Sequence, residues 1–308
     1  MRIFRLFLTV ILMLAISAHA LAASQLKMQK VANNVYAIVG DLGNRTPENF
    51  GNNATFGFVV TDDGVVLIDS GGTYKGAEEI NKVIRQVTSK PVKIVINTGG
   101  QDHRWLGNGY FKKLGAKIIA SSKAVEDQKA RVQDQLSMLR MLVGAAGLEG
   151  TNPVYADETF GETLTFESGK TVFNVIHAGH AHTPGDSFVW LPKQRVVFAG
   201  DIIFVERMLG VQEHSKSSTW IKSFEAIQAL KPAAIVPGHG HVTNLKRAKA
   251  DTYDYLVFLR NAVGKFMKDG GSIADVGKID QSKFSYLKNY DTLKGRNAQQ
   301  VYSEMQWE

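Results

Sequence analysis

The sequence contains no cysteine among its 308 residues. This absence excludes disulfides as a source of stability, and it removes thiolate from the candidate metal ligands. Any metal site must therefore be built from His, Asp, Glu or Gln side chains. Runs of Ser, Pro or Gln that would mark a long linker are also absent, and no repeat of solenoid period is visible.

Dense basic stretches are lacking as well. The chain has 36 Lys and Arg residues against 29 Asp and Glu, a formal charge of +7. These basic residues are scattered and are not interleaved with aromatic residues as on a nucleic-acid-binding surface. We therefore expect no nucleic-acid partner, and the mildly basic surface favours an anionic small-molecule substrate.

The N-terminal apolar run, from Leu6 to Ala18, is too short to span a bilayer comfortably. It follows Arg2 and Arg5 and leads into small residues that fit a cleavage pattern, which indicates a secretory signal peptide over residues 1–22. An uncleaved membrane anchor is the alternative. The signal peptide predicts a periplasmic or secreted protein with no stable membrane span after cleavage.

Strand and helix patterns alternate after residue 22. Strands are expected at 35–39, 55–60, 64–69, 92–96, 117–120 and 234–236, with hairpin-like groups at 163–176 and 187–204; helices are expected at 75–87, 122–144, 219–230 and 245–267. This order predicts two mixed sheets packed face to face with helices outside, in one domain over 23–308. Its core is expected to span about 30–245, with a C-terminal helical extension over 246–308. The apolar stripe in the 122–144 helix predicts core packing, with a Met-rich pocket wall as the alternative.

Four of the expected strands lead into residues that can bind a metal. They are followed by the segments 97–108 (NTGGQDHRWLGN), 180–186 (HAHTPGD), 198–201 (FAGD) and 237–241 (PGHGH). Each segment has Gly or Pro beside a ligand-type side chain, and loops on a rigid scaffold are where sites are built. The spacing between them fits chain units that return to the same sheet edge.

These motifs, in this order, resemble those of the metallo-β-lactamase superfamily. The matching pieces are VVLID at 65–69, INT at 96–98, HTPGD at 182–186, FAGD at 198–201 and PGHG at 237–240. The resemblance implies a four-layer αββα sandwich of the α/β (α+β) class, with a metal site at one edge of the sheets. It also implies a hydrolase that activates water to attack the carbonyl of an ester, thioester, lactone or lactam. In that family His182 would bind a first metal, Asp201 would bridge two metals, and His239 would bind a second.

The turn at 97–108 departs from the family's H-x-H-x-D-H hallmark. Without gaps, the four ligand positions become Gly99, Gln101, His103 and Arg104. With the Asp-His pair held in place, Asp102 and His103 survive while Thr98 and Gly100 replace the first two histidines. Both alignments keep His103 and lose the turn histidines of the first metal.

We therefore expect one metal, most simply Zn²⁺, held mainly by His103, Asp201 and His239, with Asp102 as fourth ligand or catalytic base. A second ion or another divalent metal is the alternative for the cofactor. His182 would lie nearby, beside the metal or as partner to a weakened first ion.

The surroundings of this site carry further expectations. His180 is an additional candidate ligand, and Gln101 offers a weak carbonyl oxygen. Arg104 is interpreted either as an anchor for a substrate anion or as a surface salt bridge, and Trp105 as a packing residue. The competing function is a non-catalytic periplasmic binding or accessory protein on the same fold. A redox enzyme is disfavoured because the ligand set lacks the Glu or extra His of a clear di-iron site.

Overall fold

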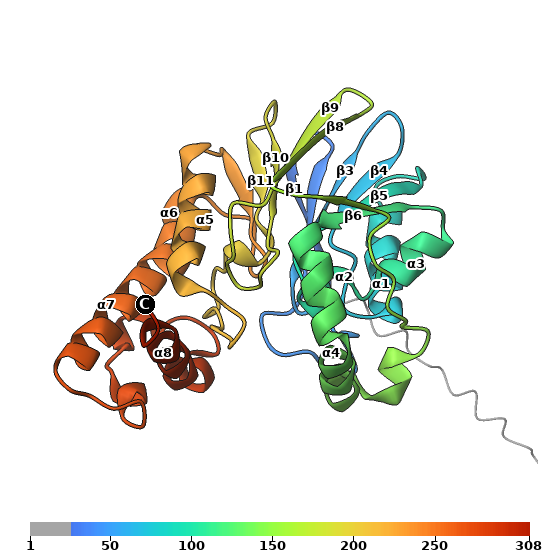
Figure 1. Cartoon of the computed structure of the whole chain (residues 1–308). Helices are drawn as coiled ribbons and strands as arrows, with labels where there is room; N and C mark the ends of the chain where they lie inside the picture. Colours follow the sequence, from blue (N-terminus) through green and yellow to red (C-terminus); the bar gives the residue numbers. More distant parts are fainter. Residues whose placement is uncertain (1–25) are drawn as a thin grey trace, which may run out of the picture.

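The computed structural model describes residues 26–308, so the expected signal peptide lies outside the described residues. Within this range two sheets pack face to face with helices on both outer surfaces (Figure 1). The αββα sandwich expected from the sequence is confirmed. No helix of the described range has the length and apolar character needed to cross a bilayer.

The larger sheet has seven strands within the described residues, in the order β1 to β7. Its strands are β1 (Lys27–Ala32), β2 (Val35–Val39), β3 (Thr55–Val60), β4 (Val65–Ile68), β5 (Val92–Asn97), β6 (Lys117–Ser121) and β7 (Glu158–Phe160). Pairing is antiparallel from β1 to β4 and parallel from β4 to β7. The carboxyl ends of β4 to β7 therefore share one edge of the sheet.

The smaller sheet has five strands within the same range, in the order β12-β11-β10-β9-β8. They are β8 (Thr163–Ser168), β9 (Thr171–Ile176), β10 (Phe188–Leu191), β11 (Val196–Phe198) and β12 (Ala234–Val236). Strand β10 is antiparallel to both β9 and β11, and β11 is parallel to β12. Strands β9, β11 and β12 thus end at the same edge.

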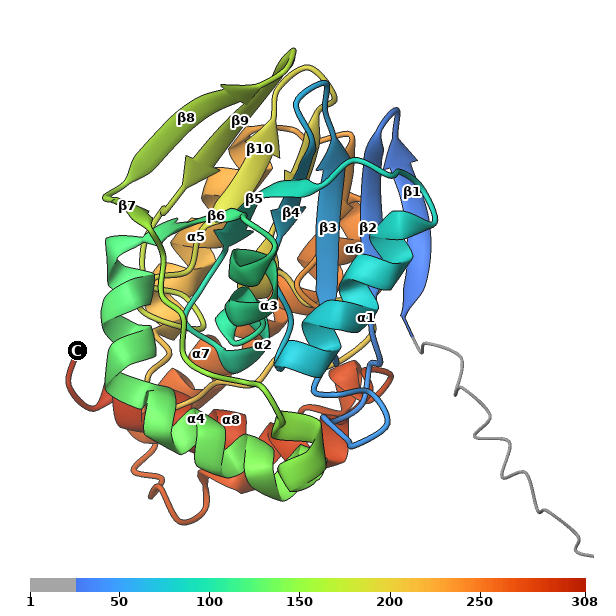
Figure 2. The ribbon, with the colours of Figure 1, turned by 90° about the vertical axis from the view of Figure 1, so that its right-hand side faces the viewer.

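Three buried apolar layers hold the sandwich together. The middle layer joins the inner faces of the two sheets and includes Val59, Ile96, Phe173 and Phe198. A second layer packs the larger sheet against α1 (Tyr74–Arg85) and α3 (Asn108–Lys113), which lie in front of that sheet in Figure 2. These strands are apolar on both faces because both faces are covered.

The third layer packs the smaller sheet against the C-terminal half of the chain. It contains residues of α5 (Ser217–Ala229), α7 (Asp254–Lys268) and α8 (Tyr290–Met305), among them Trp220, Tyr255 and Val301. The expected helical extension over 246–308 is thus packed into the sandwich, where it forms part of one outer layer together with α5. Burial of these large side chains against the sheet is the main stabilisation of this half.

Several helix and strand boundaries differ from the sequence expectations. The strand group at 187–204 ends at Phe198, because Gly200 (φ 52°) turns the chain into the 3-10 turn η1 (Gly200–Ile202). The single helix expected over 245–267 is α6 (Leu245–Ala248), a π-helical turn (Lys249–Tyr253) and α7. These two expectations are wrong in detail, since hydrophobic periodicity does not report a local change in helix pitch.

Helix α4 (Ser122–Leu148) covers the expected 122–144 and continues past it across Gly144 (φ 73°), which breaks the regular helix. Its apolar stripe is only half used in packing. Leu139 and Val143 are buried against Trp105, whereas Met138 and Met141 are 50% and 73% exposed. Core packing is therefore confirmed for the leucine side of the stripe.

Backbone hydrogen bonds join the two sheets at the edge where the candidate ligands lie. The amide of Thr55 donates to the carbonyl of Gly238 at 2.7 Å, and the amide of Ser187 donates to the carbonyl of Thr98 at 2.7 Å. The amide of Gly238 also donates to the carbonyl of Ile203 at 2.8 Å, so the loops that follow β5, β9, β11 and β12 are tied to their neighbours across this edge.

Candidate metal centre

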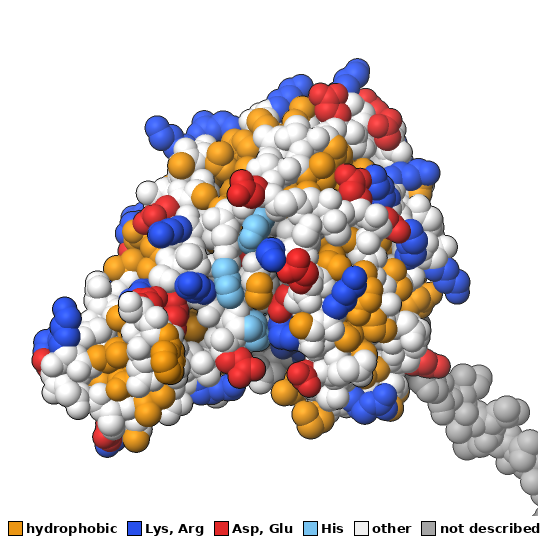
Figure 3. Space-filling view, viewed as in Figure 1, with side chains coloured by type: hydrophobic (Ala, Val, Ile, Leu, Met, Phe, Trp, Pro, Cys, Tyr) orange, Lys and Arg blue, Asp and Glu red, His pale blue; other side chains and the backbone are white. Residues whose placement is uncertain are grey.

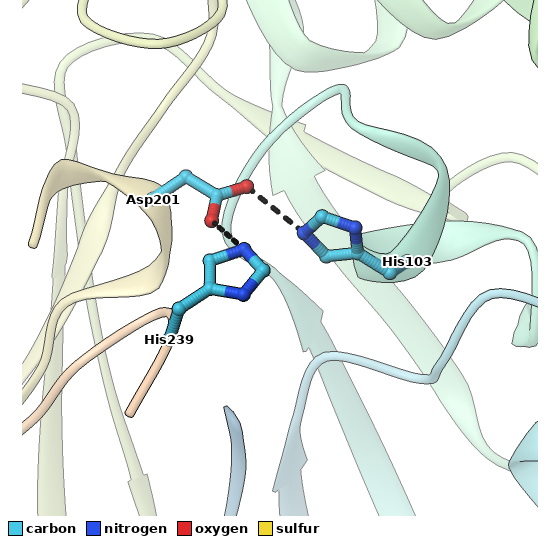
Figure 4. Close-up of side chains that lie close together, drawn as sticks. All are labelled: His103, Asp201 and His239. Atoms are coloured by element: carbon cyan, nitrogen blue, oxygen red, sulfur yellow. Dashed lines mark hydrogen bonds and ion pairs between the residues drawn. The ribbon is translucent and has the colours of Figure 1, made fainter. Parts of the chain in front are cut away.

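Three side chains from three strand ends converge at this edge. His103 lies in α2 (Asp102–Trp105) after β5, Asp201 in η1 after β11, and His239 in the loop after β12. His103 Nε2 is 3.2 Å from Asp201 Oδ2, and His239 Nε2 is 3.3 Å from Asp201 Oδ1 (Figure 4). In the described part of the chain these three form the group of metal-capable residues, with their ligand atoms all within 4.8 Å of one another.

Two of the separations, each to a different oxygen of Asp201, are close to those expected of zinc ligands. Bonds of about 2.0–2.1 Å at tetrahedral angles place neighbouring ligand atoms about 3.3 Å apart. Two imidazoles and one carboxylate also form the ligand type that zinc accepts at catalytic sites. The three residues therefore fit a single divalent cation.

The hydrogen bonding of His239 leaves one ring nitrogen for a metal. His239 Nδ1 is 2.8 Å from the carbonyl oxygen of Asn53, which can only accept, so Nδ1 carries the proton. Burial, followed by the charge of Arg207, lowers the pKa of His239 well below its ordinary value and keeps the ring neutral. Its Nε2 lone pair then faces the Asp201 carboxylate with no proton between them, an arrangement that a cation would stabilise.

Arg104 fixes the carboxylate of Asp201. Its Nη2 and Nε donate to Asp201 Oδ1 and Oδ2 at 2.5 and 3.0 Å, and its Nη1 donates to Asp69 Oδ2 at 2.9 Å. Burial opposes ionisation of Asp201, but Arg104 and His103 together hold its pKa well below the ordinary value. The approach of Arg104 requires Gly238, because a Cβ there would lie 2.6 Å from Nη2 and 1.9 Å from the carbonyl oxygen of Gly200.

The position of Arg104 corrects one interpretation made from the sequence. Its side chain is 0% exposed, so it is not a surface salt bridge. It also presents no exposed surface to a substrate anion. Arg104 is a buried cation that orients a candidate metal ligand.

Asp102 lies outside the three-residue group. Its Oδ1 is 3.1 Å from His103 Nδ1, the ring nitrogen that does not face Asp201, and it also pairs with Arg45. Burial opposes ionisation, but Arg45 and His103 lower the pKa of Asp102 below its ordinary value. The carboxylate is positioned to orient the His103 ring from behind, as carboxylates do for metal-binding histidines.

His182 and His180, from the loop after β9, differ in what they contact. His182 Nδ1 is 3.0 Å from the carbonyl oxygen of Gly210, and its ring packs 5.4 Å from that of Trp220. Burial lowers the pKa of His182 to about 4. His182 faces the same cavity as His103 and His239, whereas His180 is bound through Nε2 to the carbonyl oxygen of His214 at 2.7 Å.

The glycine turn at 97–108 is held in place by hydrogen bonds from α4. Gln128 and Gln135 donate to the carbonyl oxygens of Gly99 and Gly100 at 3.1 and 2.7 Å. A Cβ at Gly99 would lie 2.4 Å from Asp186 Oδ1, and one at Gly100 would lie 1.8 Å from Asp127 Oδ2. A histidine at either position would collide with a carboxylate.

The positions of Gln101 and Asp102 agree with the alignment without gaps, although its first position, Gly99, faces Asp186. Thr98 Oγ1 bonds Asp69 and Gly100 faces Asp127, so the two residues that the other alignment places at the first histidine positions do not face the cavity. Gln101 lines the cavity, and its buried Oε1 has no hydrogen-bond partner among the described residues. Asp102 is not a ligand position in this alignment, in agreement with its place behind His103.

A cavity of about 90 Å³ is lined by two residues of the group, His103 and His239. Histidine side chains gather in a line on this face, at the junction of the two halves of the molecule (Figure 3). The lining includes His103, His182, His239, Gln101, Arg45 and Arg207. The sequence analysis missed Arg45 and Arg207, since neither lies in a recognisable motif.

Comparison with known proteins agrees with this geometry. A family model described as the metallo-beta-lactamase superfamily matches residues 51–239, which contain all three residues of the group. The chain belongs to this superfamily. The resemblance stated from the sequence motifs is confirmed.

Individual relatives within the superfamily are distant. A metallo-beta-lactamase type 2 of Elizabethkingia meningoseptica is 28% identical over 70% of this chain and 79% of that protein. Metallo-beta-lactamase IND-1 of Chryseobacterium indologenes is 24% identical over 60% of this chain and 73% of that protein.

Two solved structures show the same fold. A metallo-beta-lactamase from Pontibacter korlensis superposes with a TM-score of 0.59 at 22% identity, covering 76% of this chain and 99% of its own. The inverting sec-alkylsulfatase of a Pseudomonas species superposes with a TM-score of 0.73 at 16% identity, covering 90% of this chain and 50% of its own. At these identities the likeness concerns the fold alone.

Proposed function

We propose that this protein is a metal-dependent hydrolase that uses one divalent cation, zinc, bound by His103, Asp201 and His239. The observation that carries the proposal is that His239 Nε2 lies 3.3 Å from the Asp201 carboxylate, beside His103, while its Nδ1 faces the carbonyl oxygen of Asn53. Such a buried arrangement of acceptors is costly unless a cation lies between them. A redox role is not supported, because the group offers one carboxylate and two imidazoles only.

The proposed reaction is the attack of water on the carbonyl carbon of an ester, thioester, lactone or lactam. A bound zinc ion would supply Lewis acidity and lower the pKa of a water molecule toward about 7. Arg104 keeps the carboxylate of Asp201 ionised and oriented, and Asp102 orients the ring of His103. His182 Nε2 lines the cavity as a hydrogen-bond acceptor for water, because its Nδ1 is committed to Gly210.

The relatives named as metallo-beta-lactamases support a hydrolase. At 28% identity they do not assign the β-lactam as the substrate. We further propose that the reaction takes place in the periplasm or outside the cell, because the N-terminal residues have the pattern of a signal peptide.

Metal content tests the proposal directly. After reconstitution with zinc and removal of excess, the wild-type protein is expected to retain about one equivalent by elemental analysis, and His103→Ala less than about a tenth of it. His241→Ala is the matched control, because His241 follows the same strand as His239 but bonds Glu206 outside the group. Equal zinc content in His103→Ala and His241→Ala would contradict the placement of the site.

Turnover separates the hydrolase from a binding or accessory protein. The zinc-loaded wild type is expected to hydrolyse at least one member of a panel of esters, thioesters, lactones and lactams, and His103→Ala none. Stoichiometric zinc without turnover of any member would favour the non-catalytic alternative.

A further inference from the structure

We propose that Asn53 is a specificity-determining residue whose side-chain carbonyl accepts a hydrogen bond from an N–H group of the substrate, next to the reacting carbonyl. The assignment deepens the proposed function and rests on it for the position of the reacting group. The acceptor itself follows from the contacts of Asn53.

Asn53 lies in the loop between β2 and β3, and its backbone is held at both polar atoms. Its amide donates to the carbonyl oxygen of Gly51 at 3.1 Å, and its own carbonyl oxygen lies 2.8 Å from His239 Nδ1. The residue is 2% exposed, and it lines the same cavity as His103 and His239. Asn53 therefore contacts a candidate metal ligand, and its side chain starts from a fixed point beside the metal centre.

The side-chain amide of Asn53 has a donor that is used and an acceptor that is not. Its Nδ2 donates to the carbonyl oxygen of Gly43 at 3.1 Å, which sets the orientation of the amide. Its Oδ1 is buried and has no hydrogen-bond partner among the described residues. Arg45 Nε and Arg207 Nε, two further buried atoms at this cavity, are likewise unpaired within residues 26–308, so neither supplies the missing donor. Because a buried amide oxygen is normally paired, we expect the donor to come from a molecule in the cavity.

Gln101 shows the same pattern from the glycine turn. Its Nε2 donates to Asp102 Oδ1 at 3.3 Å, while its buried Oε1 is unpaired among the described residues. Two carbonyl acceptors thus belong to the lining of one cavity, one beside His239 and one two residues before His103. A carboxylate or another oxyanion brings only acceptors and leaves both oxygens unpaired, whereas an N–H group supplies what they lack.

The size of the cavity places the donor close to the reacting carbonyl. At about 90 Å³ the cavity holds roughly three water molecules at ~30 Å³ each. That space suits a carbonyl group and the atoms next to it, with the remainder of the substrate outside. A substrate without a donor would displace water from Asn53 and leave its oxygen unpaired, which lowers affinity. Asn53 therefore selects substrates that carry an N–H on the carbon next to the reacting carbonyl.

Two zinc-binding thiols that differ in one N–H group test this role by titration calorimetry on the zinc-loaded protein. In N-acetylcysteamine the thiolate stands in for the metal-bound oxygen of the substrate. Its N–H lies as many bonds from the sulfur as an N–H on the neighbouring carbon lies from that oxygen. The N-methyl analogue keeps the thiol and the acyl group but has no donor. The wild type is expected to bind N-acetylcysteamine at least about fivefold more tightly than the analogue.

Asn53→Ala separates hydrogen bonding from steric fit. The variant loses the acceptor, while the carbonyl oxygen of Gly43 keeps a hydrogen bond from Arg207 Nη1 at 3.1 Å. N-acetylcysteamine is expected to bind about fivefold more weakly, and the N-methyl analogue to bind as before. If the bulk of the methyl group caused the preference, the analogue would instead bind more tightly and N-acetylcysteamine would not change. Should Asn53→Ala not fold, Asn53→Leu keeps the branched shape without the acceptor and is expected to show the same loss.

Asn49 provides a matched control in the same loop. It is 6% exposed, its Oδ1 accepts from the amides of Thr46 and Gly51 at 2.9 and 3.0 Å, and it lies outside the lining of the cavity. Asn49→Ala should lower the Tm, because buried donors lose their partner, and should keep the wild-type preference for N-acetylcysteamine. An equal loss of preference in the Asn49 and Asn53 variants would indicate a shift of the loop and would overturn the role of Asn53.

Equal binding of the two thiols by the wild type would also overturn this role, while leaving the metal centre in place. Failure of the metal proposal looks different: a chain that retains no zinc by elemental analysis would bind neither thiol, and both proposals would fall. A chain that retains zinc and prefers N-acetylcysteamine, yet hydrolyses no member of the panel, would keep the acceptor and lose the hydrolase.

Discussion

The two sides of the cavity, the glycine turn at 97–108 and the group around Asp201 and His239, differ in how protein atoms fill the space beside them. Around the glycine turn, every approach is filled: Gln128 and Gln135 bond its carbonyls, and Asp186 and Asp127 occupy the space where side chains at 99 and 100 would go. Around Asp201, His239 and Arg207, acceptors face acceptors and donors lack partners. The glycine turn is closed by packing, although Gln101 Oε1 and Gln128 Oε1 lack partners there, whereas the side chains around Asp201 converge on a space that suits an added ion.

This difference explains how a turn that has lost two histidines can belong to a coherent site. Hydrogen bonds and glycine contacts have closed the first metal position, while the second keeps three convergent ligands. The ligand is expected at the second position, because only there do three metal-capable side chains of the described residues converge. His182, between the halves, is bonded through Nδ1 and keeps only its other nitrogen toward the cavity.

The largest effect is expected from a substitution at Asp201, in the group of candidate metal ligands. Asp201→Asn removes a candidate ligand and one of the two carboxylates that neutralise Arg104, whose side chain is fully buried. Breaking a buried pair in this way costs about 3–5 kcal/mol. Zinc content should fall to background, and urea unfolding should show the loss of stability.

A surface pair provides the control for Asp201→Asn. Asp269 pairs with Lys265, and the two side chains are 61% and 79% exposed. Asp269→Asn is expected to change the free energy of unfolding by less than about 1 kcal/mol and to leave zinc content unchanged. A similar loss of unfolding free energy in both variants would contradict the role of Asp201 as the buried partner of Arg104.

The closed half should respond to pH through Asp186. Burial, followed by the charge of Asp201, raises the pKa of Asp186 from 3.8 to about 8 in the folded chain. Between these values the unfolded chain releases a proton that the folded chain retains, so the stability of the wild type should fall as pH rises from about 4 to about 8.

Asp186→Asn removes this titration. The variant should gain stability relative to the wild type as pH rises through that window, by up to roughly 4 kcal/mol at pH 7, and the difference should vanish near pH 4. Denaturant unfolding of the chelator-treated proteins at several pH values measures it. Parallel pH profiles for the two proteins would contradict a protonated Asp186.

The sequence predicts the fold well because its signals are strong and repeated. Apolar strands that lead into Gly-rich segments with His and Asp residues specify both the sheets and the edge where they meet, so the motifs alone predict that His103, Asp201 and His239 lie together. The π-helical turn at Lys249–Tyr253 and the early end of β11 were not, since both depend on local backbone conformation.

The polar surroundings of the site were harder to predict. Arg104 reads as a surface residue because arginine is rarely buried, and only the convergence of Asp69 and Asp201 from distant strands makes its burial tolerable. Arg45 and Arg207 carry no motif at all. Their role depends on loops meeting in space, which spacing along the chain does not encode.

The smallest effect tests how tightly the closed half is packed. Gly100→Ala would put a Cβ 1.8 Å from Asp127 Oδ2, and Asp127 is held by Arg131 through two hydrogen bonds of 2.7 and 2.5 Å. Moving this pair is expected to cost about 1–3 kcal/mol, the usual range for overpacking. Gly161→Ala is the matched control, because a Cβ there meets nothing within 4 Å. Both alanines restrict the unfolded chain equally, so the difference between the two unfolding free energies isolates the collision. Equal stability of the two variants would mean that the turn has room for a side chain, and that the first metal position is not closed by packing.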